Sequence, residues 1–503
     1  YERQYRGKNR KQMNITELQQ SYASHPNVEG VCRLLKDNSV RHLYCGGLYA
    51  SAASLFSSVL VQRATCPLVF ILGDMEEAGY FYHDLTQILG TEQVLFFPSS
   101  FRRAIKYGQK DAANEILRTE VLSRLQKGEE GLCVVTYPDA LAEKVVSRKE
   151  LGENTLKLHA GERVDMDFVT DVLRSYGFEY VDYVYEPGQY AVRGSIIDVF
   201  SFSSEYPFRI DFFGDEVESI RTFEVETQLS KEKKESIVIV PDLIHSLEKR
   251  ESGGMVSFLD FLPSDSLLAM RDFLWLRERI QTVHDESLTL QAIAARESEE
   301  NGAITLEGKL IDGGEFTLRA LDFRRMEFGN KPTGTPDATV SFHTTVQPIF
   351  HKNFDMVAES FREYLSRHYT IYICSDSLKQ TDRIRAIFED RGDNISFTAV
   401  ERTLHEGFAD DTLRICVFTD HQLFDRFHKY NLKSDKARSG KVALSLKELN
   451  QFTPGDYVVH TDHGVGRFAG LVRIPNGDTT QEVMKIVYQN EDVVFVLSLI
   501  HIS

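Results

Sequence analysis

The sequence predicts a multidomain α/β protein. Its 503 residues exceed what one hydrophobic core holds, since single cores rarely grow beyond about 250–300 residues. Short apolar strands alternate with amphipathic helices over residues 1–155 and again over 340–430, which is typical of parallel sheets covered by helices. Elsewhere, successive short strands separated by turn residues predict smaller antiparallel sheets.

Residues 1–152 form the first part of an α/β domain. In the stretch Asp111–Gln126, Leu117, Val121 and Leu125 share one helical face. The run Leu68–Leu72 is apolar throughout, as in strands that are buried on both faces. We predict helices at Asn14–Tyr22, Val28–Lys36, Ala50–Val61, Met75–Leu89 and Asp111–Gln126, and strands at His42–Cys45, Leu68–Leu72, Gln93–Phe97 and Leu132–Val135.

Residues 153–238 predict a small α+β domain with the helix Met166–Tyr176 and a β-meander. Pro187-Gly188 and Gly214-Asp215 supply turns, and the strand Phe208–Phe213 lies between them. One face of this meander is apolar. The other face carries Arg193, Arg209, Asp211 and Phe213.

The remaining residues divide into four parts. Residues 239–335 complete the first domain, with a buried strand at Ser266–Met270 and a long polar helix at Leu276–Ser298. Residues 336–430 predict a second small α/β domain of unknown role. Residues 431–445 are a charged linker, and the short strands of residues 446–503 predict a small SH3-like barrel. Within the second α/β domain we predict helices at Phe354–Arg367 and Leu378–Arg391, and strands at Thr370–Cys374, Ile395–Val400 and Leu413–Thr419.

The composition points to protein partners. The net charge of −17 opposes general binding to DNA, because most of that affinity comes from Lys and Arg at phosphates. No apolar run approaches the roughly 20 residues that a membrane helix needs. The six cysteines form no CxxC pair and predict reduced thiols of a cytoplasmic protein. No set of residues at metal-ligand spacing indicates a metal site.

Two stretches carry a resemblance to known families. Tyr185–Ser230, which includes Arg-Ile-Asp-Phe-Phe-Gly-Asp-Glu-Val-Glu, resembles the damage-recognition protein UvrB in its UvrA-binding domain. Phe452–Leu471, with Val-Val-His-Thr-Asp-His-Gly-Val-Gly-Arg-Phe, resembles the RNA-polymerase-interacting domain of the transcription-repair coupling factor (Mfd) family, which UvrB lacks. The resemblance implies a UvrB-like, degenerate P-loop-type α/β domain with an inserted α+β UvrA-binding domain. It also implies a second small α/β domain and a C-terminal SH3-like (Tudor/CarD-like) β-barrel.

The nucleotide-binding motif expected of a UvrB-like domain is degenerate. A P-loop reads GxxxxGK[ST], and its lysine meets the β- and γ-phosphates. Here the spacing begins at Gly47, but Ala52 replaces the second glycine and Ala53 replaces the lysine before Ser54. Where the resemblance implies an acidic metal-binding pair, the chain has Arg271-Asp272. We therefore predict an inactive nucleotide site and no cofactor in this chain.

The resemblance implies two protein-docking sites. UvrA would contact Arg193, Arg209 and Phe213; the alternative is that the arginines pair with Asp211 or Glu216 and that Phe213 is part of the core.

The RNA polymerase β subunit would dock on an exposed strand edge. That edge would contain Leu471, Arg473 and Ile474 and would end at Pro475. The alternative is that Ile474 closes the barrel core.

The function predicted from these observations is that of an adaptor. The chain would be the N-terminal, non-motor part of a transcription-coupled DNA repair factor. ATP, magnesium and DNA would be bound by motor domains beyond residue 503, in an ATP-dependent translocase that displaces stalled polymerase. The alternative is a UvrB-like, ATP-dependent enzyme acting on damaged DNA. Ser498–Ser503 end in the middle of the pattern and are expected to be partly foreign to the protein.

Overall fold

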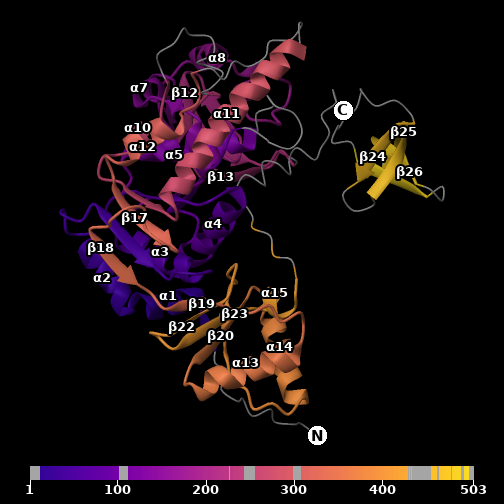
Figure 1. Cartoon of the computed structure of the whole chain (residues 1–503). Helices are drawn as coiled ribbons and strands as arrows, with labels where there is room; N and C mark the ends of the chain where they lie inside the picture. The colour runs from indigo at the N-terminus through magenta and orange to yellow at the C-terminus, as the bar shows by residue number, and fades with distance from the viewer. Residues whose placement is uncertain are drawn as a thin grey trace. The chain divides into compact units, whose positions relative to one another are not determined.

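The structure is a computed structural model that describes residues 12–100, 112–225, 227–242, 255–297, 308–426, 428, 430, 432, 455–460, 464–476, 479–488 and 492–497. The chain divides into two compact units. One comprises residues 1–155 with 243–432, and the other 156–242 with 433–503. Figure 1 shows the helices and strands of the whole chain.

A seven-stranded sheet forms the centre of the first unit, and every pairing in it is parallel. Its strands are apolar and largely buried because helices cover them, as the sequence predicts. The order across the sheet is β18 (Ala338–Ser341), β2 (His42–Gly46), β17 (Arg324–Gly329), β16 (Leu267–Met270), β3 (Leu68–Ile71), β5 (Cys133–Thr136) and β4 (Val94–Phe97).

Capped helices accompany this sheet. The side chain of Asn14 accepts from the Glu17 backbone N–H to begin α1, and Asp74 accepts from the Glu77 N–H to begin α4. Residues 52–61 of α3 are all buried. The helices are α1 (Ile15–Ala23), α2 (Pro26–Leu34), α3 (Ala52–Arg63), α4 (Met75–Leu89), α5 (Ala112–Lys127), α6 (Pro138–Ala142), α7 (Arg148–Glu153), α10 (Phe258–Phe261), α11 (Phe273–Glu297) and α12 (Gly313–Ala320). A short pair, β6 (Val145–Val146) with β15 (Met255–Val256), completes this part.

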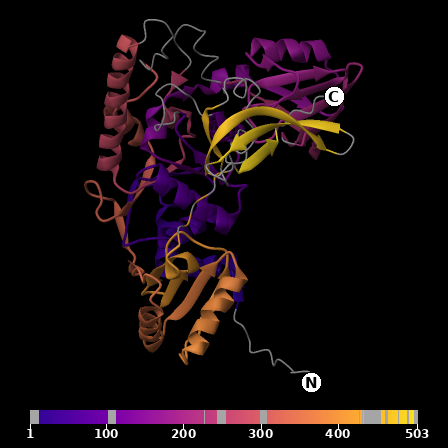
Figure 2. The same cartoon turned by 90° about the vertical axis from the view of Figure 1, so that its right-hand side faces the viewer.

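The second α/β sheet of the first unit contains a strand that the sequence pattern does not predict. β1 (Gln12–Asn14) pairs in parallel with β21 (Thr398–Glu401), far along the chain. The order is β1, β21, β20 (Thr370–Ser375), β23 (Ile415–Thr419), β22 (Phe408–Asp410) and β19 (Thr344–Val346). The accompanying helices are α13 (Phe354–Ser366), α14 (Leu378–Asp390) and α15 (Asp420–Leu423), drawn in orange in Figure 2.

Residues 156–242 form the expected α+β domain. Its core contains Val169 and Leu173 of α8 (Met166–Ser175) with Ile197 and Ile210 of the sheet. The sheet order is β13 (Ser230–Lys234), β12 (Glu216–Phe223), β11 (Phe208–Phe213), β10 (Ile196–Val199), β9 (Gln189–Arg193) and β8 (Glu179–Tyr180). β7 (Leu156–His159) pairs with β14 (Ser236–Ile239), so the chain enters and leaves this domain side by side.

The C-terminal strands form a four-stranded antiparallel sheet. In order they are β24 (Tyr457–His460), β25 (Gly464–Asn476), β26 (Thr479–Val487) and β27 (Val493–Leu497). β25 is longer than expected from the sequence and has a register shift between Phe468 and Leu471, where Gly470 has a φ of 105°. Within the described residues, no helix combines the length and apolarity that crossing a membrane requires.

Candidate docking faces and a blocked phosphate loop

The polar face of the meander contains a buried carboxylate that holds two arginines. Asp198 of β10 is 1% exposed and lies directly opposite Arg209 of β11 in the strand register. Arg209 donates from Nε and Nη2 to the two carboxylate oxygens at 2.7 and 2.9 Å. Arg193, at the end of β9, donates to the same carboxylate. Because Asp198 accepts these hydrogen bonds, the pKa of Arg209 is raised.

Aromatic rings pack against both guanidinium groups. The Arg193 guanidinium carbon lies 4.9 Å from the centre of the Tyr183 ring, and that of Arg209 lies 4.5 Å from the Phe223 ring. Phe213 is 79% exposed beside the Gly214 turn. A phenylalanine so exposed makes no contribution to a core, and its ring is accessible to a partner.

The alternative for these residues was that the arginines pair within the domain and that Phe213 is part of the core. The arginines do pair within the domain, but with Asp198 instead of Asp211 or Glu216. Asp211 accepts from Arg221 and from the Ser219 hydroxyl at 2.8 Å. Sequence reasoning missed Asp198, although its position on the arginine face follows from the alternation of β10. The arrangement leaves Phe213 and part of Arg193 accessible.

The loop between β2 and α3 has the position of a phosphate-binding loop, but the N–H groups of residues 49 and 51–53 are already engaged. Gly47 has a φ of 77°, and its carbonyl accepts from the Thr344 hydroxyl at 2.7 Å. The Tyr49 N–H donates to Thr344 Oγ1 at 3.0 Å, and the Ser51 N–H donates to the Glu406 carbonyl at 3.3 Å. The N–H groups of Ala52 and Ala53 close turns within the loop. These four N–H groups are therefore not available to a phosphate.

A carboxylate takes the remaining polar groups of this loop. Asp84 of α4 accepts from the hydroxyls of Ser51 at 2.6 Å and Ser54 at 2.9 Å. It also accepts from the His405 backbone N–H at 2.7 Å. Burial raises the pKa of Asp84 to about 6. The Ser54 hydroxyl, which would coordinate magnesium in a P-loop, is thus engaged within the protein.

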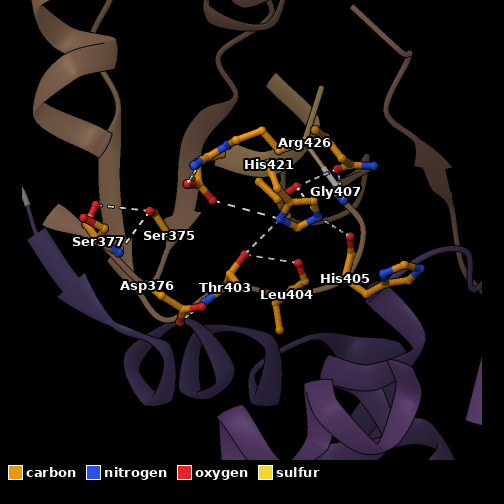
Figure 3. Close-up of polar contacts among 12 residues, drawn as sticks. Ser375, Asp376, Ser377, Thr403, Leu404, His405, Gly407, His421 and Arg426 are labelled. Atoms are coloured by element: carbon orange, nitrogen blue, oxygen red, sulfur yellow. Dashed lines mark hydrogen bonds and ion pairs between the residues drawn. The ribbon is translucent and has the colours of Figure 1, made fainter. Parts of the chain in front are cut away.

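Residues 403–407 lie against this loop and Asp84 through the His405 and Glu406 N–H groups. Hydrogen bonds from α15 and neighbouring loops hold this segment in place. Figure 3 shows His421 of α15 at the centre of this support, with Nε2 2.8 Å from the His405 carbonyl and Nδ1 3.4 Å from the Thr403 hydroxyl. The Thr403 N–H donates to Asp376 at 3.2 Å, and the Gly407 N–H donates to the Gln422 side chain at 2.8 Å. Residues 403–407 are therefore an ordered loop that belongs to the second α/β sheet.

The residues at the expected metal position have structural partners. Arg271 forms an ion pair with Glu77 of α4 at 2.6 Å. Asp272 accepts from the Trp275 backbone N–H at 2.9 Å and so caps α11. A cavity of about 400 Å³ remains beside the loop, and Asp74, Glu76, Glu77, Asp84 and Glu406 line it together with Arg271. This excess of carboxylates opposes the entry of a polyphosphate.

The second candidate docking site lies on β25. Leu471, Arg473 and Ile474 pair with Met484, Glu482 and Gln481 of β26. β24 pairs only with residues 464–467 of β25. Among the strands that the structure describes, none pairs with the other side of residues 471–475, so this stretch is a strand edge. The side chains of Leu471, Arg473 and Ile474 lie outside the described part of the structure.

The fold defines a multidomain α/β protein with an inserted α+β domain and a C-terminal antiparallel sheet. Residues 156–244 match the family described as UvrB interaction domain, and residues 452–497 match the CarD-like/TRCF RID domain. The relatives identify the protein class more closely. The chain is 24% identical to the transcription-repair-coupling factor of Staphylococcus aureus (strain bovine RF122 / ET3-1) and 23% identical to that of Bacillus subtilis (strain 168). Each match covers 90% of this chain and 44% of the relative.

The chain is thus homologous to transcription-repair coupling factors over nine-tenths of its length, and it spans less than half the length of these relatives. The resemblance inferred from the two short stretches is confirmed, as is the multidomain α/β class with its inserted UvrB-type domain.

Proposed function

We propose that this chain is the protein-docking, non-motor part of a transcription-repair coupling factor that works in the cytoplasm. The domain of residues 153–238 recruits UvrA through Arg193, Arg209 and Phe213. The C-terminal sheet of residues 446–503 binds the RNA polymerase β subunit through the edge at Leu471, Arg473 and Ile474. ATP-driven translocation on DNA belongs to other domains of the whole factor.

The exposure of Phe213 carries the UvrA assignment. An aromatic ring that is 79% exposed, on the face where Asp198 aligns two arginines, has the composition of an interface hot spot. The match of residues 156–244 to a UvrB interaction domain supports this choice of domain. For polymerase, the side of residues 471–475 that no described strand pairs with suits the addition of a partner strand.

The blocked loop supports a non-enzymatic role for this chain. Ala53 supplies no cation, Asp84 and Glu406 engage Ser51, and Arg271 is paired with Glu77. A UvrB-like ATPase needs these groups for phosphate and magnesium. We therefore assign no catalytic residue.

Co-purification tests the proposal. The 503-residue chain is expected to retain UvrA and, in a separate experiment, polymerase containing the β subunit. An Arg193→Ala/Phe213→Ala variant should lose UvrA and keep polymerase, which serves as its internal control for folding. Retention of UvrA by that variant at wild-type affinity would refute the assignment of the docking face.

A further inference from the structure

The two arginines of the docking face share one counterion. Asp198 uses Oδ1 for Arg209 Nε, and Oδ2 for Arg209 Nη2 and for Arg193. In the strand register Asp198 lies opposite Arg209 on one side and opposite Ala191 on the other, which leaves Arg193 diagonal to it. A single carboxylate therefore bridges two guanidinium groups that come from different strands.

Burial makes this bridge rigid. Asp198 is 1% exposed, and a buried carboxylate is stable only while its hydrogen-bonding partners stay in place. Arg209 is further fixed by Nη1, which donates to the Gln228 carbonyl at 3.2 Å. The Tyr183 ring packs against the other arginine, Arg193. Long, flexible side chains are thus ordered before any partner arrives.

The charge balance around Asp198 favours an acidic partner. Asp198 neutralises one of the two arginines, so the group retains one positive charge. The same transverse row continues through Arg221, which is paired with Asp211, to Lys233. Arg193 remains about one third exposed. A carboxylate-bearing surface complements such a face.

We propose that Asp198 is a positioning residue for docking: it orders Arg193 and Arg209 together, so that both present their remaining donors to an acidic patch on UvrA. This inference rests on the proposed function. Ordering both side chains in the free protein lowers the entropy cost of forming the interface, so loss of the carboxylate should weaken binding even though Asp198 itself touches no partner.

The test is the affinity of the whole 503-residue chain for UvrA. Asp198→Asn keeps the shape and removes the charge, and we expect the Kd to rise about tenfold. Asp211→Asn is the matched control, because Asp211 is a neighbouring carboxylate whose hydrogen bonds go to Arg221 and Ser219. Its effect should stay below about threefold.

Coupling separates positioning from a general loss of structure. In an Arg193→Ala/Arg209→Ala background, Asp198→Asn should change the Kd by less than about twofold, since no arginine remains to be positioned. An equal loss in both backgrounds would overturn the proposal. So would wild-type affinity of folded Asp198→Asn.

A second variant covers the case in which Asp198→Asn does not fold. Arg209→Lys keeps the positive charge but cannot form the two-pronged pair with Asp198, so we expect about a tenfold rise in the Kd. Wild-type affinity of this variant would overturn the inference. A different result would refute the proposed function itself: the Arg193→Ala/Arg209→Ala variant would bind UvrA as tightly as the wild type.

Discussion

The Ser51 hydroxyl lies 2.6 Å from the Asp84 carboxylate, inside a loop with the position and spacing of a phosphate-binding loop. The Asp84 carboxylate accepts hydrogen bonds from loop hydroxyls that could otherwise face the phosphates of a nucleotide. The Glu406 N–H donates to the same hydroxyl at 3.0 Å, which ties the loop to the second α/β sheet. The loop has thus become a structural joint between two sheets of one unit.

Nucleotide binding is the first property to measure. We expect no saturable binding of Mg-ATP up to about 1 mM, because Asp84 engages the Ser51 and Ser54 hydroxyls and repels phosphate. Isothermal titration calorimetry of the whole chain checks this, with a P-loop ATPase in the same buffer as the positive control. Saturable binding at micromolar ATP would instead support the UvrB-like enzyme.

Gly47→Ala should destabilise the first unit. The φ of 77° strains any L-residue, and an added Cβ would lie 2.0 Å from the Phe342 carbonyl oxygen. We expect a loss of about 2–4 kcal/mol in the free energy of unfolding. Gly30→Ala is the control, since Gly30 lies in α2 with open space around its Cα. There alanine should stabilise the helix by about 0.5–1 kcal/mol. Chemical denaturation measures both, and equal effects would contradict the strain at Gly47.

Acid should weaken the first unit through its buried histidines. Burial lowers the pKa of His83 and of His405 to about 4. The folded protein therefore binds fewer protons than the unfolded chain between about pH 6.5 and 4, and stability falls as the pH falls through this window. Asp84 acts in the opposite direction, because its pKa is raised to about 6 and the folded state takes up its proton first. Two histidines outweigh one carboxyl group, so the net expectation is a loss.

Urea unfolding at pH 7.5 and pH 4.5 measures this dependence. His83→Gln should reduce the loss on acidification by about 2 kcal/mol, because that side chain is 7% exposed in the folded protein. His159→Gln, at an exposed position of another domain, should leave the loss unchanged. An unaltered pH dependence of His83→Gln would show that His83 does not carry the effect.

Phe213→Ala should weaken UvrA binding by about tenfold or more, since exposed aromatic anchors account for much of an interface's affinity. The matched control is Phe168→Ala, because Phe168 is a 54% exposed phenylalanine on α8 of the same domain. We expect less than a twofold effect there. Equal losses for both variants, measured by surface plasmon resonance, would argue against a docking site centred on Phe213.

Ile474→Asp should weaken binding of the polymerase β subunit. A charge on the edge of β25 that no described strand pairs with opposes the addition of a partner strand, and we expect about a tenfold loss. Val465→Asp is the control, because Val465 is exposed on the part of β25 that already pairs with β24. A pull-down titration distinguishes them, and undiminished binding of Ile474→Asp would remove this edge from the proposed function.

The local sequence pattern was sufficient to predict many of the helices and strands. The helix Met75–Leu89 was predicted with the bounds it has, because Asp74 caps it and Gly90 ends it. The meander followed from its turns. By contrast, β1 has three residues and no periodicity, and its partner β21 lies at the other end of the unit.

The candidate sites, too, were predictable only where they depend on local sequence. The sequence locates the degenerate loop and the exposed Phe213 face. It does not reveal that residues 403–407 cover the loop, or that Asp198 joins the two arginines. Both depend on which residues the three-dimensional fold brings together. Only the register of β10 against β11 sets Asp198 opposite Arg209.

The pairing of β1 with β21 has a consequence for biogenesis. During translation, Gln12–Asn14 leave the ribosome early but have no partner strand until Thr398–Glu401 have been made. The seven-stranded sheet can form before Gln12–Asn14 have a partner strand, because its last strand, β18, precedes β21 in the chain. Truncated chains that begin after Asn14 would therefore leave the edge of β21 unpaired, and we expect them to aggregate during or soon after synthesis.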